Sequence, residues 1–315
     1  MNYGLLVYDY GENPSGYTGV NMPQDTRNIG DYIQSLSVKQ FLPRVDRLVD
    51  RESIKFYYGE KIRLVMNGWW RIHGGTNDIS RRIIPLFVSY HVHNTQNFPK
   101  ETLVYLKENQ PIGCRDLATR LFLKERGIDA YFSGCMSLTL GKSYSVDSGK
   151  KTDEIIFVDY PSGENRLRRF FTNKKIEKII SNLMRNKDQS KIIHLTHFFP
   201  GNTTHNERFA LADKLLRRYA AAKMVVTSRL HCALPCVAMG TPVLLVNNKY
   251  DRRYTGLADL VNYAGPTEQD NFCYPINLRK EEYLEDEEIT LINPQDHIQL
   301  ANKLEENVRN FIRGD

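Results

Sequence analysis

Short apolar runs alternate with amphipathic segments along the chain, and this alternation constrains the fold more than any other feature of the sequence. In the first half, apolar runs at residues 5–8, 62–66 and 85–90 predict strands, and the patterns at 31–42 and 117–126 predict helices. Strands that alternate with helices are typical of parallel sheets. We therefore predict an α/β fold.

The alternation restarts after a polar stretch at residues 141–151, which predicts a flexible linker. Beyond it, strands and helices are predicted in alternation at residues 154–158, 175–184, 191–195, 206–220, 224–226 and 243–246. Two such blocks predict two Rossmann-like domains that face a cleft, residues 1–145 and 150–294. The amphipathic segment 295–315 predicts a C-terminal helix that packs back on the first domain.

Composition limits the classes of partner and compartment. The net charge of +6 arises from 43 basic and 37 acidic residues, which suits an anionic small substrate or a membrane surface. It lacks the dense basic clustering of a nucleic-acid binder, so no nucleic-acid partner is expected. The five cysteines have no paired spacing, which favours free thiols and a cytoplasmic location. We expect neither a secretory signal nor a membrane span.

Arg229-Leu230-His231 is the segment that most strongly indicates chemistry. It follows the apolar run 224–226 and precedes a segment of small residues that predicts a buried helix. A guanidinium and an imidazole therefore lie at the carboxyl end of a strand, where open α/β sheets bind their ligands. A cation beside a titratable ring suits an anionic substrate and a proton transfer. The alternative is a surface or structural role for both residues.

Common catalytic motifs are missing from the sequence. No G-x-G-x-x-G follows a strand, and the P-loop pattern fails at Gly141-Lys142-Ser143 because Met136 stands where its first glycine belongs. There is also no G-x-S-x-G and no H-E-x-x-H. Cys232 and Cys236 beside His231 make only three zinc ligands without finger-like spacing, so no metal site is predicted.

Several segments together resemble the polysaccharide pyruvyl transferase family, from about residue 25 to about residue 260. They are Asn28-Ile29-Gly30-Asp31 with Gln34, Pro111-Ile112-Gly113-Cys114-Arg115-Asp116 with Thr119, Gly127, Ser133-Gly134-Cys135, and Ser228-Arg229-Leu230-His231 with Gly240-Thr241-Pro242. The most specific part is R-L-H followed nine residues later by G-T-P.

The resemblance implies a fold similar to GT-B glycosyltransferases and chemistry on phosphoenolpyruvate. The pyruvyl group of this co-substrate becomes a cyclic ketal on a sugar, and no further cofactor is implied. Members of the family act in the assembly of bacterial capsule, exopolysaccharide or cell-wall polymers, some of them on lipid-linked oligosaccharides. By position, Arg115, Arg229 and His231 match the active-site residues of the family.

These matches suggest roles for the donor site. Arginine provides bidentate donors for the carboxylate and phosphate of phosphoenolpyruvate, so Arg115 and Arg229 are expected to bind it. His231 is expected to be the general acid that protonates the methylene carbon. His194 and His197, near the end of a strand of the second domain, are further candidates for phosphate contact, with packing as the alternative.

The acceptor side is predicted in the first domain. Asp31 is the candidate base for the sugar hydroxyl, with a helix N-cap as the alternative. Asn28, His91, His93 and Trp69 are candidate acceptor-binding residues, with structural roles as alternatives. A basic cluster predicts a solvated face. The alternatives are a peripheral contact with anionic lipid heads of the inner membrane and a contact with the diphosphate of a lipid carrier. The cluster comprises Arg166, Arg168, Arg169, Lys174 and Lys175.

Two other functions remain open. One is a glycosyltransferase with a nucleotide-sugar donor. Against it, no clear acid for binding a ribose follows the strand at 243–246. Asp251 does follow it, but the adjacent Arg252 and Arg253 favour anion binding instead. The other is a non-catalytic carbohydrate-binding scaffold, which would not need Arg115, Arg229 and His231.

Overall fold

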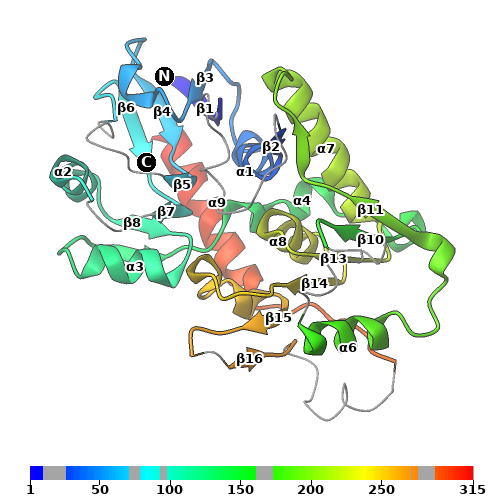
Figure 1. Ribbon diagram of the computed structural model, residues 1–315. Helices are drawn as coiled ribbons and strands as arrows, with labels where there is room; N and C mark the ends of the chain where they lie inside the picture. Colours follow the sequence, from blue (N-terminus) through cyan, green and yellow to red (C-terminus); the bar gives the residue numbers. More distant parts are fainter. Residues whose placement is uncertain are drawn as a thin grey trace. The chain divides into compact units, whose positions relative to one another are not determined.

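The computed structural model describes residues 1–9, 26–70, 79–92, 98–160, 173–269, 271–275 and 288–314 (Figure 1). These residues group into two compact units. Unit 1 comprises Met1–Thr139, Phe198–Asp213 and Ile298–Asp315, and unit 2 comprises Leu140–His197 and Lys214–His297. Both units combine parallel sheets with helices, so the predicted α/β class is confirmed; in unit 1 four strands, β4 to β7 (residues 62–92), follow one another without a helix among the described residues between them.

In its described part, unit 1 contains two parallel four-stranded sheets. The first has the order β3-β1-β4-β6, formed by Arg47–Asp50, Asn2–Val7, Ile62–Val65 and Ile83–Leu86. The second has the order β5-β7-β8-β9, formed by Gly68–Trp70, Tyr90–Val92, Ile112–Cys114 and Ala130–Phe132. β1 lies between β3 and β4, and its residues Leu5, Leu6 and Val7 are almost wholly buried.

The prediction of one strand over residues 85–90 is wrong. β6 ends at Leu86 and β7 begins at Tyr90, and the two strands belong to different sheets. Between them, Ser89 has a φ of +55°, which lies in the left-handed region and interrupts an extended chain. A non-glycine residue with this backbone gives no signal in the sequence.

The helices of unit 1 differ in how they are buried. All residues of α1 (Gly30–Lys39) except Lys39 are buried, whereas α2 (Lys100–Glu108) and α3 (Leu117–Lys124) keep exposed faces. The C-terminal helix α9 (His297–Arg313) is bonded to strands of this unit. The Tyr3 hydroxyl donates to the Ile312 carbonyl at 3.2 Å, and Asn307 Nδ2 donates to the Tyr131 hydroxyl at 3.0 Å.

Unit 2 is built, in its described part, around a six-stranded sheet with the order β11-β10-β13-β14-β15-β16. The strands are Ile192–Leu195, Ile155–Val158, Met224–Thr227, Val243–Val246, Asn262–Pro266 and Phe272–Cys273; β16 is antiparallel to β15 and the others are parallel. Every residue of β10, β13 and β14 is buried, which explains their continuous apolar runs. Helix α6 (Lys174–Leu183) packs Ile176, Ile179 and Leu183 into this core.

Two further helices of the chain matter for the site. Helix α8 (Leu230–Ala238) joins β13 to β14 and packs against both strands. Helix α7 (His205–Ala221) runs from residues of unit 1 into residues of unit 2, and it follows β12 (Phe198–Pro200), which pairs antiparallel with β2 (Thr26–Asn28). Among the described helices, none is both long enough and apolar enough to cross a lipid bilayer.

The predicted flexible linker at residues 141–151 is partly helical. Gly141–Tyr144 form α4, and Ser148–Lys150 form a 3-10 turn. A side chain at Gly141 would overlap the carbonyl oxygen of Ala238 at the end of α8, so the glycine allows a close backbone approach. Lys151 Nζ donates to Thr241 Oγ1 at 2.9 Å. The two ends of this segment are therefore held on unit 2, while most of the residues between them are exposed.

Candidate functional site

Arg229 lies at the carboxyl end of β13, as predicted, and it is the N-cap residue of α8. Its backbone N–H donates to Thr227 Oγ1 at 3.0 Å. Its side chain is largely buried, and Nε donates to Asp159 Oδ2 at 2.7 Å. The guanidinium is therefore held in place by a carboxylate from a neighbouring strand.

Asp159 was missed by the sequence analysis. It directly follows β10, and its carboxylate also accepts hydrogen bonds from Thr196 Oγ1 at 2.6 Å and from the His197 N–H at 3.0 Å. Burial alone would raise the pKa of Asp159, but Arg229 and His197 outweigh it and hold this pKa below its usual value. The available signal was an acidic residue that immediately follows a buried apolar run.

His231 occupies the first turn of α8, two residues after Arg229, and is half-buried. Backbone N–H groups at the beginning of a helix have no partner within the helix and favour anions. The structure thus brings a cation, an imidazole and a helix N-terminus together at one edge of the sheet in unit 2. This arrangement can bind an anion and deliver a proton to it.

The two histidines predicted to contact phosphate have different surroundings. His197 is 1% exposed, and its Nε2 lies 3.1 Å from the Tyr219 hydroxyl, so its ring belongs to the interior of unit 2. His194 is exposed but lies within β11 rather than beyond it, with its ring 5.6 Å from that of Phe157. A phosphate contact by either residue remains a prediction.

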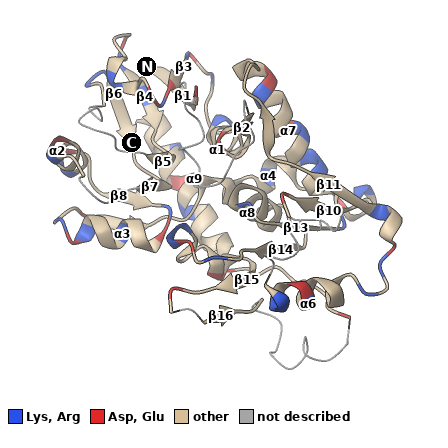
Figure 2. Ribbon diagram, in the orientation of Figure 1, with Lys and Arg blue, Asp and Glu red and all other residues tan. Residues whose placement is uncertain are grey.

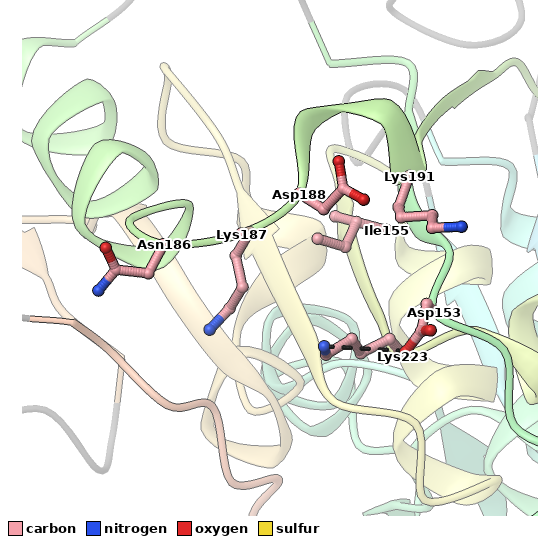
Figure 3. Close-up of a pocket in the computed structure, with 7 residues that line it drawn as sticks. All are labelled: Asp153, Ile155, Asn186, Lys187, Asp188, Lys191 and Lys223. Carbon is pink, nitrogen blue, oxygen red and sulfur yellow. Dashed lines mark ion pairs between the residues drawn. The ribbon is translucent and has the colours of Figure 1, made fainter.

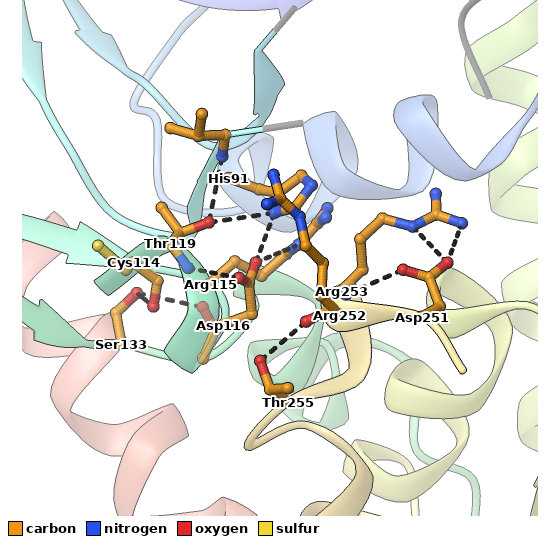
Figure 4. A network of polar contacts seen from close by, with 12 residues as sticks. His91, Cys114, Arg115, Asp116, Thr119, Ser133, Asp251, Arg252, Arg253 and Thr255 are labelled. Atoms are coloured by element: carbon orange, nitrogen blue, oxygen red, sulfur yellow. Dashed lines mark hydrogen bonds and ion pairs between the residues drawn. The ribbon is translucent and has the colours of Figure 1, made fainter. Parts of the chain in front are cut away.

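Residues after β14 form a separate basic turn of unit 2. Asp251 accepts hydrogen bonds from the Arg253 N–H at 2.9 Å and from Arg253 Nε at 2.8 Å (Figure 4). The Arg252 carbonyl accepts from Thr255 Oγ1 at 2.8 Å. The Tyr254 hydroxyl donates to the Ser228 carbonyl at 3.2 Å, which ties this turn to the segment that carries Arg229.

In unit 1, a buried polar cluster lies where β8 ends (Figure 4). Arg115 follows this strand and is 2% exposed, and Asp116 caps α3 by accepting from the Thr119 N–H at 2.9 Å. His91 of β7 places Nδ1 2.6 Å from Asp116 Oδ2 and 3.2 Å from Thr119 Oγ1. Burial would raise the pKa of Asp116, but His91 and Arg115 lower it below its usual value.

This cluster joins residues that the sequence analysis assigned to different substrates. Arg115 was predicted to bind the donor and His91 the acceptor, and Asp116 lies between them, 4.0 Å from Arg115 Nε. His91 is fully buried, so its contacts in the structure are with the protein. His93 lies outside the described residues.

The beginning of α1 places Asn28 and Asp31. Asn28 Oδ1 accepts from the Gly30 N–H at 3.1 Å, so Asn28 provides the hydrogen-bond acceptor for the first N–H group of the helix. The N-cap residue is Ile29, and Asp31 lies within the first turn, so the alternative of an N-cap role for Asp31 is wrong. Asp31 is 1% exposed and accepts from Gln34 Nε2 at 3.2 Å.

Trp69 is packed rather than open. It is 8% exposed, the Arg51 guanidinium lies 4.4 Å from its ring centre, and its carbonyl accepts from Arg51 Nη1 at 3.0 Å. A guanidinium over an aromatic face is favourable and occupies that face. Stacking on a sugar would therefore need the other face or a displaced Arg51.

The predicted basic cluster is described only in part. Arg166, Arg168 and Arg169 lie outside the described residues, while Lys174 and Lys175 are exposed in the first turn of α6. Figure 2 shows basic and acidic residues together on α6 and α7. The described part of the chain contains no group of three or more His, Cys, Asp or Glu side chains arranged to hold a metal ion.

A pocket of about 240 Å³ lies elsewhere in unit 2 (Figure 3). It is lined by Asp153, Ile155, Asn186, Lys187, Asp188, Lys191 and Lys223. Three of these residues, Asp153, Lys191 and Lys223, precede β10, β11 and β13, so the pocket lies at the amino ends of the strands. Arg229 lies at their carboxyl ends, at the opposite edge of the sheet.

Comparisons with known proteins identify the family. The sequence profile of the polysaccharide pyruvyl transferase family matches residues 28–250 of the 315. Among solved structures, the chain matches that of an uncharacterized protein from Klebsiella pneumoniae with 13% identity and a TM-score of 0.43, over 81% of this chain and 86% of that one. No curated protein matches the chain. Because the family profile covers more than half of its length, this chain belongs to the polysaccharide pyruvyl transferase family.

Proposed function

We propose that the chain transfers the pyruvyl group of phosphoenolpyruvate to a sugar of a bacterial polysaccharide or lipid-linked oligosaccharide and forms a cyclic ketal. The family implies pyruvyl transfer to a polysaccharide. The observation that carries the choice of donor is the fixed Arg229 guanidinium beside His231 at the beginning of α8. A small dianionic or trianionic ligand needs such a cation and such a helix end.

In the proposed reaction, Arg229 binds a negatively charged group of the donor. His231 protonates the methylene carbon of phosphoenolpyruvate, which makes the neighbouring carbon electrophilic. A sugar hydroxyl adds to that carbon and loses its proton, and the bond to the phosphate oxygen then breaks. A second hydroxyl of the same sugar adds to the same carbon, gives its proton to the released phosphate and closes the ketal, so the products are the ketal and inorganic phosphate.

Unit 1 holds further groups that we propose for this reaction. Asp31 is the proposed base for the sugar hydroxyl, and Asn28, Trp69, His91 and His93 are proposed for the acceptor. Arg115 is proposed to bind a substrate anion. We also propose a cytoplasmic location, which the five free thiols support, and a peripheral contact with the inner membrane when the acceptor is lipid-linked.

The test is phosphate release by the purified chain from phosphoenolpyruvate in the presence of a lipid-linked galactoside. We expect His231→Ala to lower turnover at least about a hundredfold, as is typical of a lost catalytic acid. We expect Arg229→Ala to raise the KM for phosphoenolpyruvate at least about tenfold, the scale of a lost charge-assisted hydrogen bond, and so to lower turnover at subsaturating donor. Arg218→Ala is the matched control, because Arg218 pairs with Glu154 at 3.1 Å at the other end of β10.

A thermal-shift comparison separates this proposal from the alternative donor. We expect phosphoenolpyruvate to raise the melting temperature and uridine nucleotides to leave it unchanged. Stabilisation by the nucleotides alone would indicate a glycosyltransferase. Turnover that is unaffected in both Arg229→Ala and His231→Ala would contradict the proposed roles.

A further inference from the structure

Asp159 lies where neighbouring strands of the unit 2 sheet end. It follows β10, which is placed between β11 and β13. On one side its carboxylate accepts from Thr196 Oγ1 and the His197 N–H, both just beyond β11. On the other side it accepts from Arg229 Nε, just beyond β13. The carboxylate therefore connects the ends of adjacent strands to the guanidinium.

The main chain of Asp159 is tied to the same segment. Its carbonyl accepts from Ser228 Oγ at 2.9 Å, and the Ser228 carbonyl accepts from the Tyr254 hydroxyl at 3.2 Å. Asp159 has a φ of +50°, a left-handed conformation that short polar side chains tolerate better than most residues. Both the carboxylate and the peptide of Asp159 thus contact the residues that precede α8.

The ion pair of Asp159 and Arg229 is shielded from water, so its geometry determines how the guanidinium is oriented. The Asp159 and Arg229 side chains are 9% and 12% exposed. A guanidinium recognises a carboxylate or phosphate through a planar fork of N–H groups, so binding depends on the orientation of that plane. A short hydrogen bond at Nε restricts rotation of the plane before any ligand arrives.

We propose that Asp159 is a positioning residue that orients the Arg229 guanidinium toward the carboxylate or phosphate of the donor. This inference rests on the proposed function. Without Asp159, Arg229 keeps its charge but loses its fixed plane. The affinity for phosphoenolpyruvate therefore falls more than the rate of proton transfer from His231, and KM changes more than kcat.

A double-mutant cycle tests this proposal. We expect Asp159→Asn to raise the KM for phosphoenolpyruvate at least about tenfold, the scale of one charge-assisted hydrogen bond, with a smaller change in kcat. In the Arg229→Ala background, Asp159→Asn adds no more than about twofold, because its effect passes through Arg229. The positioning role would be overturned if the KM of the double variant rose by the product of the two single-variant changes. It would also be overturned if Asp159→Asn lowered kcat as much as it raised KM.

The control and the second variant use the same sheet. Glu154→Gln removes the carboxylate that pairs with Arg218 at the other end of β10 and should leave KM unchanged. Thr196→Val removes a donor to Asp159 at an exposed position, and we expect a rise in KM of about threefold. If Asp159→Asn does not fold, a KM equal to wild type in Thr196→Val overturns the proposal.

A measurement that does not depend on turnover distinguishes failure of the proposed function from failure of the positioning role. If the wild-type protein releases no phosphate, the proposed function fails. The positioning is then decided by solvent exchange of the Arg229 Nε–H, followed by ¹⁵N NMR. We expect Asp159→Asn, or Thr196→Val in its place, to accelerate this exchange; equal rates would overturn the inference.

Discussion

The buried pair of His91 and Asp116 allows a prediction in which two contributions are separated. Asp116 Oδ1 caps α3 at the Thr119 N–H, and Oδ2 binds His91 Nδ1. Loss of an N-cap costs about 1 kcal/mol, and removal of one partner of a buried pair costs about 3 kcal/mol or more. Both side chains are at most 1% exposed, so solvent cannot replace the lost contacts.

The substitutions Asp116→Asn and Asp116→Ala divide these costs. Asparagine keeps the capping oxygen and loses the charge, so we expect about 3 kcal/mol of destabilisation. Alanine loses both, and we expect about 4 kcal/mol. Hydrogen exchange of the α3 amides measures this destabilisation locally. A single unfolding midpoint would not assign it to one part of a chain with two units.

The same comparison of stability at lower pH tests the charge of Asp116. Because the pKa of Asp116 is lowered in the folded state, the carboxylate stabilises the fold above the ordinary value of 3.8. The difference between wild type and Asp116→Asn should persist from pH 7 to about pH 5 and shrink as the pH falls through the folded-state pKa.

The exposed Asp188 is the control, since it caps a 3-10 turn at the Ser190 N–H. Asp188→Asn should change stability by less than about 0.5 kcal/mol. A cost below about 1 kcal/mol for Asp116→Asn, or a difference from wild type that widens in acid, would refute the reasoning.

The remaining predictions concern packing and thiol access. Gly141→Ala should destabilise unit 2 by about 1–3 kcal/mol, because its methyl group overlaps the Ala238 carbonyl. Gly149→Ala should be close to neutral, since nothing lies near its added carbon. Chemical unfolding of the two variants compares their stabilities. Cys273 is the half-buried thiol, and the other four cysteines are buried, so Cys273 should react first with a thiol reagent. Its reaction should speed up with pH above the usual thiol range, because burial raises its pKa, and Cys273→Ser should abolish this first phase when labelling is followed by mass spectrometry. Labelling of a second thiol at the same rate would contradict the burial.

The sequence predicted elements whose signal is local. The runs of β10, β13 and β14 are continuous because both faces of these strands are buried, and the order R-L-H follows β13 by chain connectivity alone. Asp159 could not be found in this way, because its partner Arg229 lies 70 residues further along the chain. Their contact depends on β10 and β13 being neighbours in the sheet.

The surroundings of three predicted site residues also depend on contacts that are distant in the sequence. His197 and His194 lie near the same strand end, but one ring is buried against Tyr219 and the other is exposed beside Phe157. Which of two nearby histidines points inward depends on the path of the backbone after β11. The ring of Trp69 is covered by Arg51, which follows a strand of the other sheet in unit 1.

The contact between Gly141 and Ala238 has a mechanical consequence. The chain leaves unit 1 at Thr139 and is fastened two residues later to the last turn of α8. This helix has nine residues, a rod of roughly 13 Å, and its first turn carries His231. A larger residue at position 141 would therefore displace the end of the same helix whose first turn carries the proposed acid.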